Sequence, residues 1–360
     1  AIKMMPVLAA LRTRPGLRGL SLALGQHGDL LDDVLAEWGE APDVSLARAA
    51  AGEDLSTLTA RLLTGAAGAF ATMRPDLVLV QGDTASAFSA AVAAHHARIP
   101  VGHVEAGLRS GDVDNPWPEE FHRVAIDALA ALRFAPTEGA ATRLRAEYGG
   151  GTVSVTGNTG IDALLAAARR LDSDSMLAAR VEAALPPRDP SRRLILVTMH
   201  RRENLGAPLR SVCTTLARLA RRSDVEIAWP LHPNPAVREV ARAGLAGAGR
   251  VHLLPPLSYL QTVALMRRAA FLMTDSGGLQ EEAPALGRPV LVLRETTERP
   301  EVIAAGAGLL VGTAADAVLE AATALLDDPV RLAAMSRPVF PYGDGRAAER
   351  IAALVAGFGA

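Results

Sequence analysis

The sequence predicts an α/β protein made of two similar domains. Short apolar runs, typical of buried strands, alternate with longer helical segments through both halves of the chain. A length of 360 residues is too great for one ordinary core and fits two. The segment PPRDPSRR at 186–193, rich in proline and arginine, is the best candidate for a linker. We place the first domain at 1–160 together with 346–360, and the second domain at 161–345.

Composition narrows the class of function. Hydrophobic residues make up 49% of the chain, charged residues make up 21%, and the net charge is −2. This balance describes a soluble globular protein without the basic field that attracts nucleic acid or a membrane surface. The sequence has no run of about 18 uncharged apolar residues, and Pro6 and Arg12 interrupt its opening segment too soon for a signal-peptide core. We therefore expect a cytoplasmic protein whose partners include neither nucleic acid nor a membrane.

Cysteine usage argues against a metal centre. The one cysteine, Cys213, lies in the apolar helical segment 209–219. A single cysteine allows neither a disulfide framework nor a CxxC metal site. We expect Cys213 to be a core residue, and we expect no bound metal.

The first candidate site follows two predicted strands. The apolar run Leu77–Val80 leads into Gln81-Gly82-Asp83-Thr84 and then into the alanine-rich helix 85–97. The run Val101–Val104 is a second strand, and Glu105 follows it directly. Together they form one βαβ unit with a right-handed crossover, which places Asp83 and Glu105 at the carboxyl edge of one parallel sheet. Open α/β sheets bind their ligands at that edge, so we expect both carboxylates to face a cleft.

A second acidic pair follows in the chain. Glu119 and Glu120 come after a loop stiffened by Pro116 and Pro118, and a helix is predicted over 121–131. This loop would bring an acid from the pair toward the strand ends. Acid/base chemistry needs titratable groups in different environments, so three converging acids favour a catalytic site, with Arg109 and Arg123 nearby.

The same residues also have simpler interpretations. Asp83 and Thr84 suit the N-cap of the helix that follows them. Glu119 and Glu120 suit the positive first turn of theirs. Taken singly, each acid is more often a cap than a catalyst, and only their convergence favours catalysis.

The strongest phosphate signal lies in the second half. The apolar strand 270–274 is followed by Asp275-Ser276-Gly277-Gly278 and by the helix 279–286. A serine and two glycines at a helix start expose backbone N–H groups where the helix dipole also favours negative charge, so a diphosphate fits there. Glu281 or Glu282, one turn inside the helix, could accept hydrogen bonds from ribose hydroxyls. The alternative is an ordinary glycine-rich turn.

Histidines follow three other strands. The strand 194–198 leads into the polar run 199–204, which contains His200 and suits anion recognition, with a solvated helix start as the alternative. Gln26 and His27 form a strand-to-helix turn that contacts either a ligand or only solvent, and His232 follows the strand 225–230. The chain has neither a GxGxxG in a strand–turn–helix setting nor a GxxxxGK[ST], so no dinucleotide cofactor and no P-loop are predicted.

Many of these stretches resemble the non-hydrolysing UDP-N-acetylglucosamine 2-epimerase family. The matching motifs run in order along nearly the whole chain: GQH at 25–27, QGDT at 81–84, GHVEAGLRSGD at 102–112, PWPEE at 116–120, TGN at 156–158, TMHRREN at 198–204, HPNP at 232–235, DSGGLQEEAPALGRPVL at 275–291, TERPE at 297–301 and PYGDG at 341–345. The resemblance implies two Rossmann-like domains facing across a cleft, as in GT-B glycosyltransferases. It also implies an active site in that cleft, no NAD or other cofactor, and a homodimer.

The resemblance further implies an activity and a set of residue roles. Family members interconvert UDP-GlcNAc and UDP-ManNAc by eliminating UDP across C1–C2, which gives a glycal intermediate, and adding it back with the other configuration at C2. The implied acid/base carboxylates are Asp83, Glu105 and Glu119, with His200 on the departing diphosphate. The residues implied to bind UDP are Arg123, Ser276, Gly277, Gly278, Glu282 and Arg299, and those implied to form a second, activating UDP-GlcNAc site are Gln26, His27 and His232.

The chain also departs from the family pattern. The resemblance implies a further strand and a GTRPE loop before Ala1-Ile2-Lys3-Met4, where the printed sequence starts. Thr262 stands where the family often has an aromatic residue near uracil, and His122 replaces the usual asparagine before Arg123. Asp29 stands where the activating site often has a longer polar side chain. The other functions that the sequence allows are a GT-B-type UDP-sugar glycosyltransferase and a UDP-sugar-binding protein without turnover.

Overall fold

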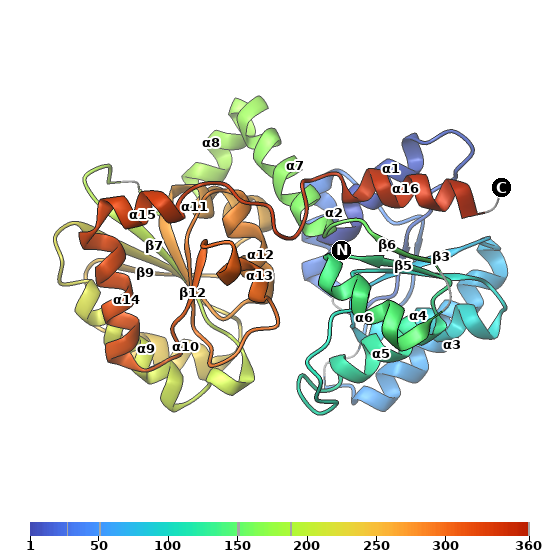
Figure 1. The fold of residues 1–360 in the computed structure, drawn as a ribbon, viewed down its shortest axis with the longest axis horizontal. Helices are drawn as coiled ribbons and strands as arrows, with labels where there is room; N and C mark the ends of the chain where they lie inside the picture. The colour runs from blue at the N-terminus through green and yellow to red at the C-terminus, as the bar shows by residue number, and fades with distance from the viewer. Residues whose placement is uncertain (27, 50–51, 150–151, 188, 359–360) are drawn as a thin grey trace. The chain divides into compact units, whose positions relative to one another are not determined.

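The computed structural model describes all residues of the chain except 27, 50–51, 150–151, 188 and 359–360 (Figure 1). The chain forms two compact units. Unit 1 comprises Ala1–Ala163 and Tyr342–Ala360, and unit 2 comprises Leu164–Pro341. The division into two domains with the boundaries predicted from the sequence stays a prediction. No helix in the described ranges is long and apolar enough to cross a membrane.

Unit 2 contains a six-stranded parallel sheet. Its strands have the spatial order β12-β11-β10-β7-β8-β9, and every neighbouring pair is parallel. Counted from the first strand of the unit, this is the order 3-2-1-4-5-6 of a Rossmann fold. The strands are β7 Arg193–Thr198, β8 Val225–Pro230, β9 Val251–Leu254, β10 Ala269–Thr274, β11 Val290–Val292 and β12 Gly308–Leu310.

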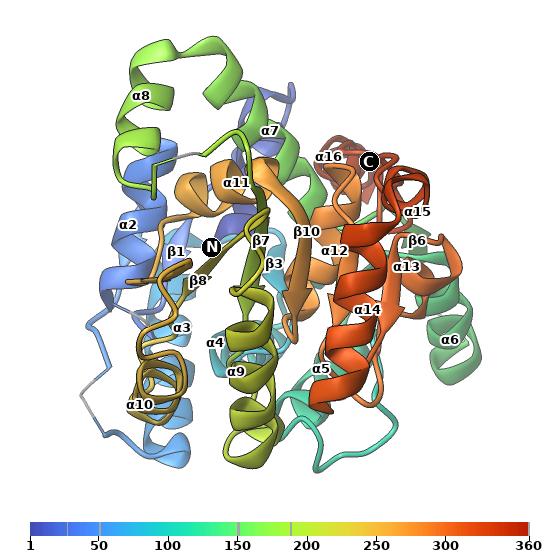
Figure 2. The ribbon, with the colours of Figure 1, turned by 90° about the vertical axis from the view of Figure 1, so that its left-hand side faces the viewer.

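Helices cover both faces of this sheet. Ile195 and Val197 of β7 pack into one core together with α9 and α14, whereas the buried Leu196 between them points to the other face. Figure 2 shows α9 and α14 running alongside each other over the strands. The helices of unit 2 are α8 Ser175–Ala183, η2 Arg202–Asn204, α9 Ala207–Leu219, α10 Pro235–Gly244, α11 Tyr259–Arg268, α12 Gly277–Ala285, α13 Pro300–Ala304, α14 Ala315–Asp327 and α15 Pro329–Met335.

Unit 1 contains two parallel sheets. The first pairs β1 with β2, and the second has the order β3-β4-β5-β6. The strands are β1 Leu22–Ala23, β2 Val44–Ser45, β3 Val78–Gln81, β4 Val101–Val104, β5 Leu132–Ala135 and β6 Thr152–Val155. The helices are η1 Ile2–Met4, α1 Met5–Thr13, α2 Gly28–Trp38, α3 Leu55–Met73, α4 Ala85–His96, α5 Glu119–Leu129, α6 Glu138–Tyr148, α16 Ala347–Phe358 and the start of α7 Thr159–Ser173.

The last helix returns to unit 1. There α16 packs beside α1, and Val7 shares a core with Ile351 (Figure 1). The carboxylate of Asp162 accepts hydrogen bonds from the N–H groups of Ala347 and Ala348, 3.2 and 2.8 Å away. Because a helix start has N–H groups without partners inside the helix, Asp162 caps α16 from 185 residues away in the sequence.

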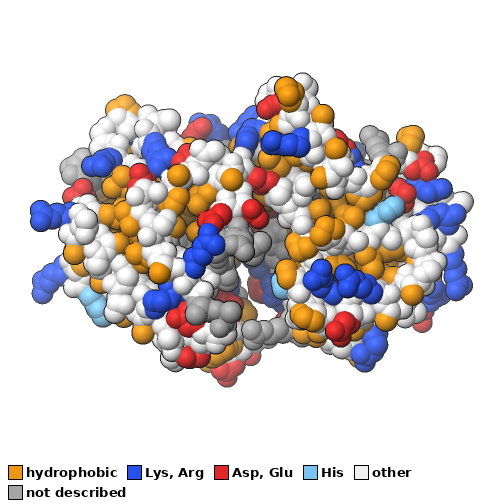
Figure 3. Space-filling view, turned by 180° about the vertical axis from the view of Figure 1, so that it is seen from behind, with side chains coloured by type: hydrophobic (Ala, Val, Ile, Leu, Met, Phe, Trp, Pro, Cys, Tyr) orange, Lys and Arg blue, Asp and Glu red, His pale blue; other side chains and the backbone are white. Residues whose placement is uncertain are grey.

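Several predicted elements have other bounds in the structure. The helix predicted over 121–131 begins at Glu119, so Glu119 and Glu120 form its first turn. The helical residues before the PPRDPSRR segment form two helices, α7 and α8, because the carboxylate of Asp174 accepts from the N–H of Leu177 and starts the second one. The strand β2, which no apolar run in the sequence predicts, is only two residues long. On the face that Figure 3 shows, acidic and basic side chains lie interspersed, in keeping with the small net charge.

Cys213 is buried, as the sequence predicted. It is 1% exposed in the core of unit 2, and Gly244 of α10 packs so closely that an added Cβ there would lie 2.9 Å from the Cβ of Cys213. Burial raises the pKa of the Cys213 thiol to about 11. The thiolate is the nucleophile in alkylation, so burial reduces both the access and the reactive fraction.

We predict that native Cys213 resists alkylation. At pH 8, iodoacetamide should modify the folded protein at least a hundredfold more slowly than the protein in denaturant, because a thiol pKa of about 11 in place of 9.0 lowers the thiolate fraction by about that factor. Intact mass over time measures both rates. Equal rates with and without denaturant would contradict the burial of this thiol.

Candidate active site

The carboxyl edge of the β3-β4 sheet holds the first group of site residues. In the parallel register Gln81 lies opposite Val104, so the turns that follow the two strands begin side by side. Asp83 lies in the turn after β3, and Glu105 lies in the turn after β4. The sequence placed both acids at this edge because parallel strands end together.

The carboxylate of Glu105 lies among donors. Its Oε1 accepts from the Nζ of Lys3 at 2.5 Å and from the Nδ2 of Asn158 at 3.0 Å, and its Oε2 accepts from Gln81. The side chain is only 8% exposed. Three polar side chains therefore surround this carboxylate, and the expectation that it faces a cleft stays a prediction. Sequence reasoning assigned no role to Lys3, which lies 102 residues before its partner.

The backbone of Glu105 adopts an uncommon conformation. Its φ of 69° lies in the left-handed region, which costs a residue with a side chain about 1–3 kcal/mol. Two backbone hydrogen bonds hold the turn, because the N–H groups of Glu105 and Ala106 both donate to the carbonyl of Phe134 at 3.1 Å. Strain of this kind is concentrated at functional sites, where surrounding contacts enforce it.

Asp83 is fixed from the side of α5. Arg123 donates to its carboxylate, and the Nδ1 of His122 lies 2.9 Å from its backbone oxygen. The N-cap of α4 is Thr84, whose hydroxyl accepts from the N–H of Ala87 at 3.2 Å. Capping therefore explains Thr84 but not Asp83, whose side chain is 28% exposed.

The two acids at the start of α5 differ. The carboxylate of Glu120 is buried and accepts from the N–H groups of Ser110 and Gly111, at 3.0 and 3.2 Å. The side chain of Glu119 is half-buried and makes no hydrogen bond or ion pair within the described residues. Of the pair, only Glu119 therefore has a carboxylate without a structural partner in that part of the chain.

The two arginines expected beside the acids have different positions. Arg123 contacts Asp83 and also lies 3.4 Å from Glu120. Arg109 instead binds Asp127 at 2.7 Å and Glu147 at 2.6 Å, so these ion pairs are not with Asp83, Glu105 or Glu119. Its guanidinium thus joins Asp127 of α5 to Glu147 of α6.

The predicted phosphate turn of unit 2 stands at the start of α12. Ser276 is the N-cap residue, and its side chain makes no capping hydrogen bond. The helix begins at Gly277, where an added Cβ would lie 2.6 Å from the Cζ of Arg299. Arg299 therefore packs its guanidinium against this turn only because residue 277 is glycine. Backbone N–H groups and a cation are together at one point, which suits a phosphate.

The two glutamates of α12 have separate partners. Glu281 accepts from the Nε of Arg299 at 2.9 Å. Glu282 lies 3.5 Å from the hydroxyl of Tyr259, and burial, followed by the charge of Glu282, raises the pKa of Tyr259 well above its ordinary value. Glu282 thus keeps a neutral phenol as its neighbour, whereas Glu281 is neutralised by a guanidinium.

His200 lies at the end of β7 above a buried carboxylate. Asp275 is fully buried and accepts from the N–H groups of His200 and Arg201 and from the Nδ2 of Asn204, at 3.0, 2.9 and 3.0 Å. The His200 ring, 3.4 Å from Asp275 through its Nδ1, is 39% exposed. Asp275 and Asn204 thus fix the turn, and sequence reasoning gave neither a role although both lie in the quoted motifs.

His232 stacks on His200. The ring centroids are 5.6 Å apart and the planes differ by 14°. Burial, followed by the nearby His200, lowers the pKa of His232, against the effect of Asp275. Gln26 lies in unit 1, where its Oε1 accepts from the N–H and the hydroxyl of Ser86 at 3.1 and 2.5 Å. His27 lies outside the described residues.

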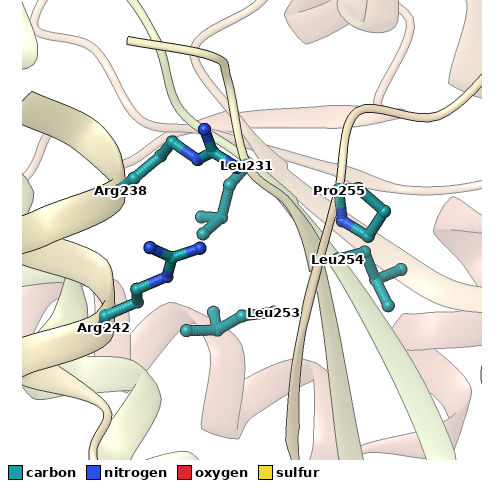
Figure 4. Close-up of a pocket in the computed structure, with 6 residues that line it drawn as sticks. All are labelled: Leu231, Arg238, Arg242, Leu253, Leu254 and Pro255. Carbon is teal, nitrogen blue, oxygen red and sulfur yellow. The ribbon is translucent and has the colours of Figure 1, made fainter. Parts of the chain in front are cut away.

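A small cavity of about 180 Å³ lies at the carboxyl end of β8 and β9 (Figure 4). Arg238 and Arg242 of α10 point over a floor formed by Leu231 and Leu253. None of the sequence-predicted site residues lines it. The described residues contain no cluster of three histidine, cysteine or acidic side chains able to hold a metal ion.

The loop after β11 is held by a charged cluster. Glu298 contacts Arg294, Arg299 and Arg201. Burial alone would raise the pKa of Glu298, but the hydrogen bond from Arg294 and the charges of the other two arginines lower it to about 2. These ion pairs hold the loop that carries Arg299, whose guanidinium packs against the α12 turn.

We predict that Glu298→Gln destabilises the fold in a pH-dependent way. The folded pKa of Glu298 lies below its ordinary 4.5, so its contribution is full above pH 4.5 and is lost as the pH falls toward about 2. At pH 7 the variant should lose on the order of 2 kcal/mol of unfolding free energy. Denaturant unfolding should show a smaller loss at pH 3.

Glu203→Gln is the matched control, because Glu203 also binds Arg294, at 3.1 Å, but is 42% exposed. It should change stability by less than about 0.5 kcal/mol. An equal loss in both variants at both pH values would contradict the assigned role of Glu298.

Comparisons with known proteins agree with the motifs. The family model described as UDP-N-acetylglucosamine 2-epimerase matches residues 9–356. A probable UDP-N-acetylglucosamine 2-epimerase of Ralstonia solanacearum is 47% identical over 353 residues, covering 98% of this chain and 94% of that protein. The UDP-N-acetylglucosamine 2-epimerase of Escherichia coli K12 is 44% identical with the same coverage of both chains.

A solved structure extends the likeness to three dimensions. The UDP-GlcNAc 2-epimerase of Neisseria meningitidis, determined with UDP-GlcNAc bound, has a TM-score of 0.94 and 37% identity, and the match covers 99% of this chain and 96% of that one. The predicted α/β class with Rossmann-like parallel sheets in both halves is confirmed. The chain therefore belongs to the UDP-N-acetylglucosamine 2-epimerase family.

Proposed function

We propose that this protein interconverts UDP-GlcNAc and UDP-ManNAc by anti elimination of UDP to a 2-acetamidoglucal intermediate, followed by re-addition. The observation that carries the proposal is the carboxylate of Glu105, held among Lys3, Gln81 and Asn158 on a strained turn at a ligand-binding sheet edge. A buried carboxylate so fixed suits proton transfer at a defined atom. Family membership supplies the reaction.

The chemistry of the sugar explains why the site needs several acids. The proton at C2 has no adjacent carbonyl and is barely acidic, so the departure of UDP must lead the reaction. The ring then gains positive charge, which nearby carboxylates stabilise. Inversion at C2 requires proton transfer at both faces of that carbon, so one carboxylate cannot serve alone. We assign these roles to Asp83, Glu105 and Glu119.

Different residues would hold the leaving group. The N–H groups at Ser276, Gly277 and Gly278 and the cation of Arg299 stabilise the negative charge that the diphosphate gains on departure. His200, with Asp275 beneath it, would donate to the same group. Arg123, whose Nε is buried without a hydrogen bond in the described chain, and Glu282 complete the proposed UDP contacts, with Glu282 on the ribose.

Other parts of the proposal concern regulation and assembly. Gln26, His27 and His232 are proposed for a second, activating UDP-GlcNAc site. A homodimer is proposed from the family resemblance, and a cytoplasmic location is proposed from the composition of the chain. The reaction as written needs no cofactor, because the electron pair that leaves with UDP returns with it.

Solvent deuterium tests the mechanism. Purified protein incubated with UDP-GlcNAc in deuterated buffer should give UDP-ManNAc that carries deuterium at C2, because the intermediate has lost that proton. Mass spectrometry and NMR of the product measure the label. Epimerised product without label would overturn elimination, and UDP binding without any product would select a binding protein. Sugar transfer to an acceptor without UDP-ManNAc would select a glycosyltransferase.

Glu105→Gln tests the acid/base assignment. The amide keeps the shape of the side chain but cannot take up a proton, so we expect kcat to fall by about 10²–10⁴-fold. UDP affinity, measured by calorimetry, should stay within about twofold, since the proposed phosphate contacts lie in unit 2. The control is Glu138→Gln, the same change at a side chain that is 69% exposed, and it should leave kcat unchanged. Full activity of Glu105→Gln would remove Glu105 from the catalytic set.

A further inference from the structure

A buried carboxylate connects the two turns that carry Asp83 and Glu105. Asp127 lies on α5 and is fully buried. Its Oδ1 lies 2.6 Å from the Nδ1 of His103, which is fully buried on β4. Its Oδ2 accepts from the N–H of Gly107 at 3.1 Å and from Arg109 at 2.7 Å.

One branch of this network reaches the turn after β3. The Nε2 of His103 lies 3.0 Å from the backbone oxygen of Gly82, the residue before Asp83. A carbonyl oxygen can only accept, so Nε2 carries a proton and donates it. His103 thus joins the carboxylate of Asp127 on one side to the backbone at Gly82 on the other.

The other branch holds the turn after β4. Gly107 stands two residues beyond Glu105, and its N–H donates directly to Asp127. Three residues of these turns have φ values in the left-handed region: 67° at Gly82, 69° at Glu105 and 84° at Gly107. The two glycines adopt this conformation without strain, whereas Glu105 is held in it only where the surroundings fix the backbone.

Stability alone does not account for this cluster. Burial by itself would raise the pKa of Asp127, yet His103, followed by Arg109, lowers it, so the group is an ionised carboxylate. Replacing a buried ion pair with well-packed apolar residues is often neutral or stabilising, because desolvation offsets the attraction. This cluster hydrogen-bonds to the backbone of two turns, at Gly82 and at Gly107. Its effect on the geometry of those turns explains it better than a gain in stability does.

We propose that Asp127 is a positioning residue that sets the separation and orientation of Asp83 and Glu105, acting on the first turn through His103 and on the second through Gly107. The proposal rests on the acid/base roles given to both acids above. A misplacement of about 1 Å at a reacting group can cost about a hundredfold in rate, so loss of one link should be visible in kcat.

Two variants separate the branches. In Asp127→Asn the side chain keeps its size but loses its charge, so both turns should loosen. In His103→Asn the amide can still donate to Asp127 from the position of Nδ1 but cannot reach Gly82, so only the turn before Asp83 should loosen. We expect kcat to fall ten- to a hundredfold in each variant, whereas KM and the Kd of UDP stay within about twofold.

Arg133→Gln is the matched control. The Nε of Arg133 donates to the backbone oxygen of Asp127 at 2.7 Å, and its guanidinium lies over the ring of Tyr148. It thus supports the same helix residue without the links to Gly82 and Gly107. The control should lower the melting temperature, as the loss of any buried hydrogen bond does, but should keep kcat within about twofold.

Amide hydrogen exchange gives a readout that does not depend on activity. Peptides covering 80–84 and 104–109 should exchange at least tenfold faster in Asp127→Asn, and only the first should do so in His103→Asn. Unchanged exchange, or faster exchange with wild-type kcat, would overturn the positioning role. If the wild-type protein makes no labelled UDP-ManNAc while the turns respond as expected, the proposed function fails although the network holds the turns.

Discussion

The parallel register of β3 with β4 is the constraint on which the acidic edge of unit 1 depends. Because Gln81 lies opposite Val104, the turns after both strands leave the sheet at one level. The carboxylates of Asp83 and Glu105 are thereby placed at one edge of the sheet. The loop that connects β4 to α5 starts at the same edge. Every later contact of the site, from Lys3 to Arg123, is made to groups that this register has already placed.

Charge neutralisation in this site is local. Each acid at the edge has its own cation: Lys3 for Glu105 and Arg123 for Asp83, while Arg109 serves Asp127 below them. Buried charges are costly unless paired and hydrogen-bonded, so these pairings allow several carboxylates to share a small volume. Glu119 differs, since no partner of its carboxylate lies in the described chain. That difference in environment is what acid/base roles require.

In unit 2 the proposed site is arranged to bind negative charge. Its α12 turn provides backbone donors, and Gly277 lets the guanidinium of Arg299 reach the same point. Two carboxylates nearby are paired with cations, since Glu281 is bound to Arg299 and Glu298 to a group of arginines. Asp275 faces inward, where it fixes the backbone of His200.

The sequence by itself determined most of the strands and helices, the acids at the ends of β3 and β4, and the serine-glycine turn at α12. These features follow from local patterns, because apolar runs, glycines and polar residues act within a few positions of one another. Only the tertiary structure decided which side chains meet. Lys3 lies 102 residues before Glu105, and Asp162 lies 185 residues before the helix that it caps. The turn of Arg109 away from the acids toward Asp127 also depends on how α5 packs on the sheet. Such contacts depend on packing between distant segments, which no periodicity in the chain encodes.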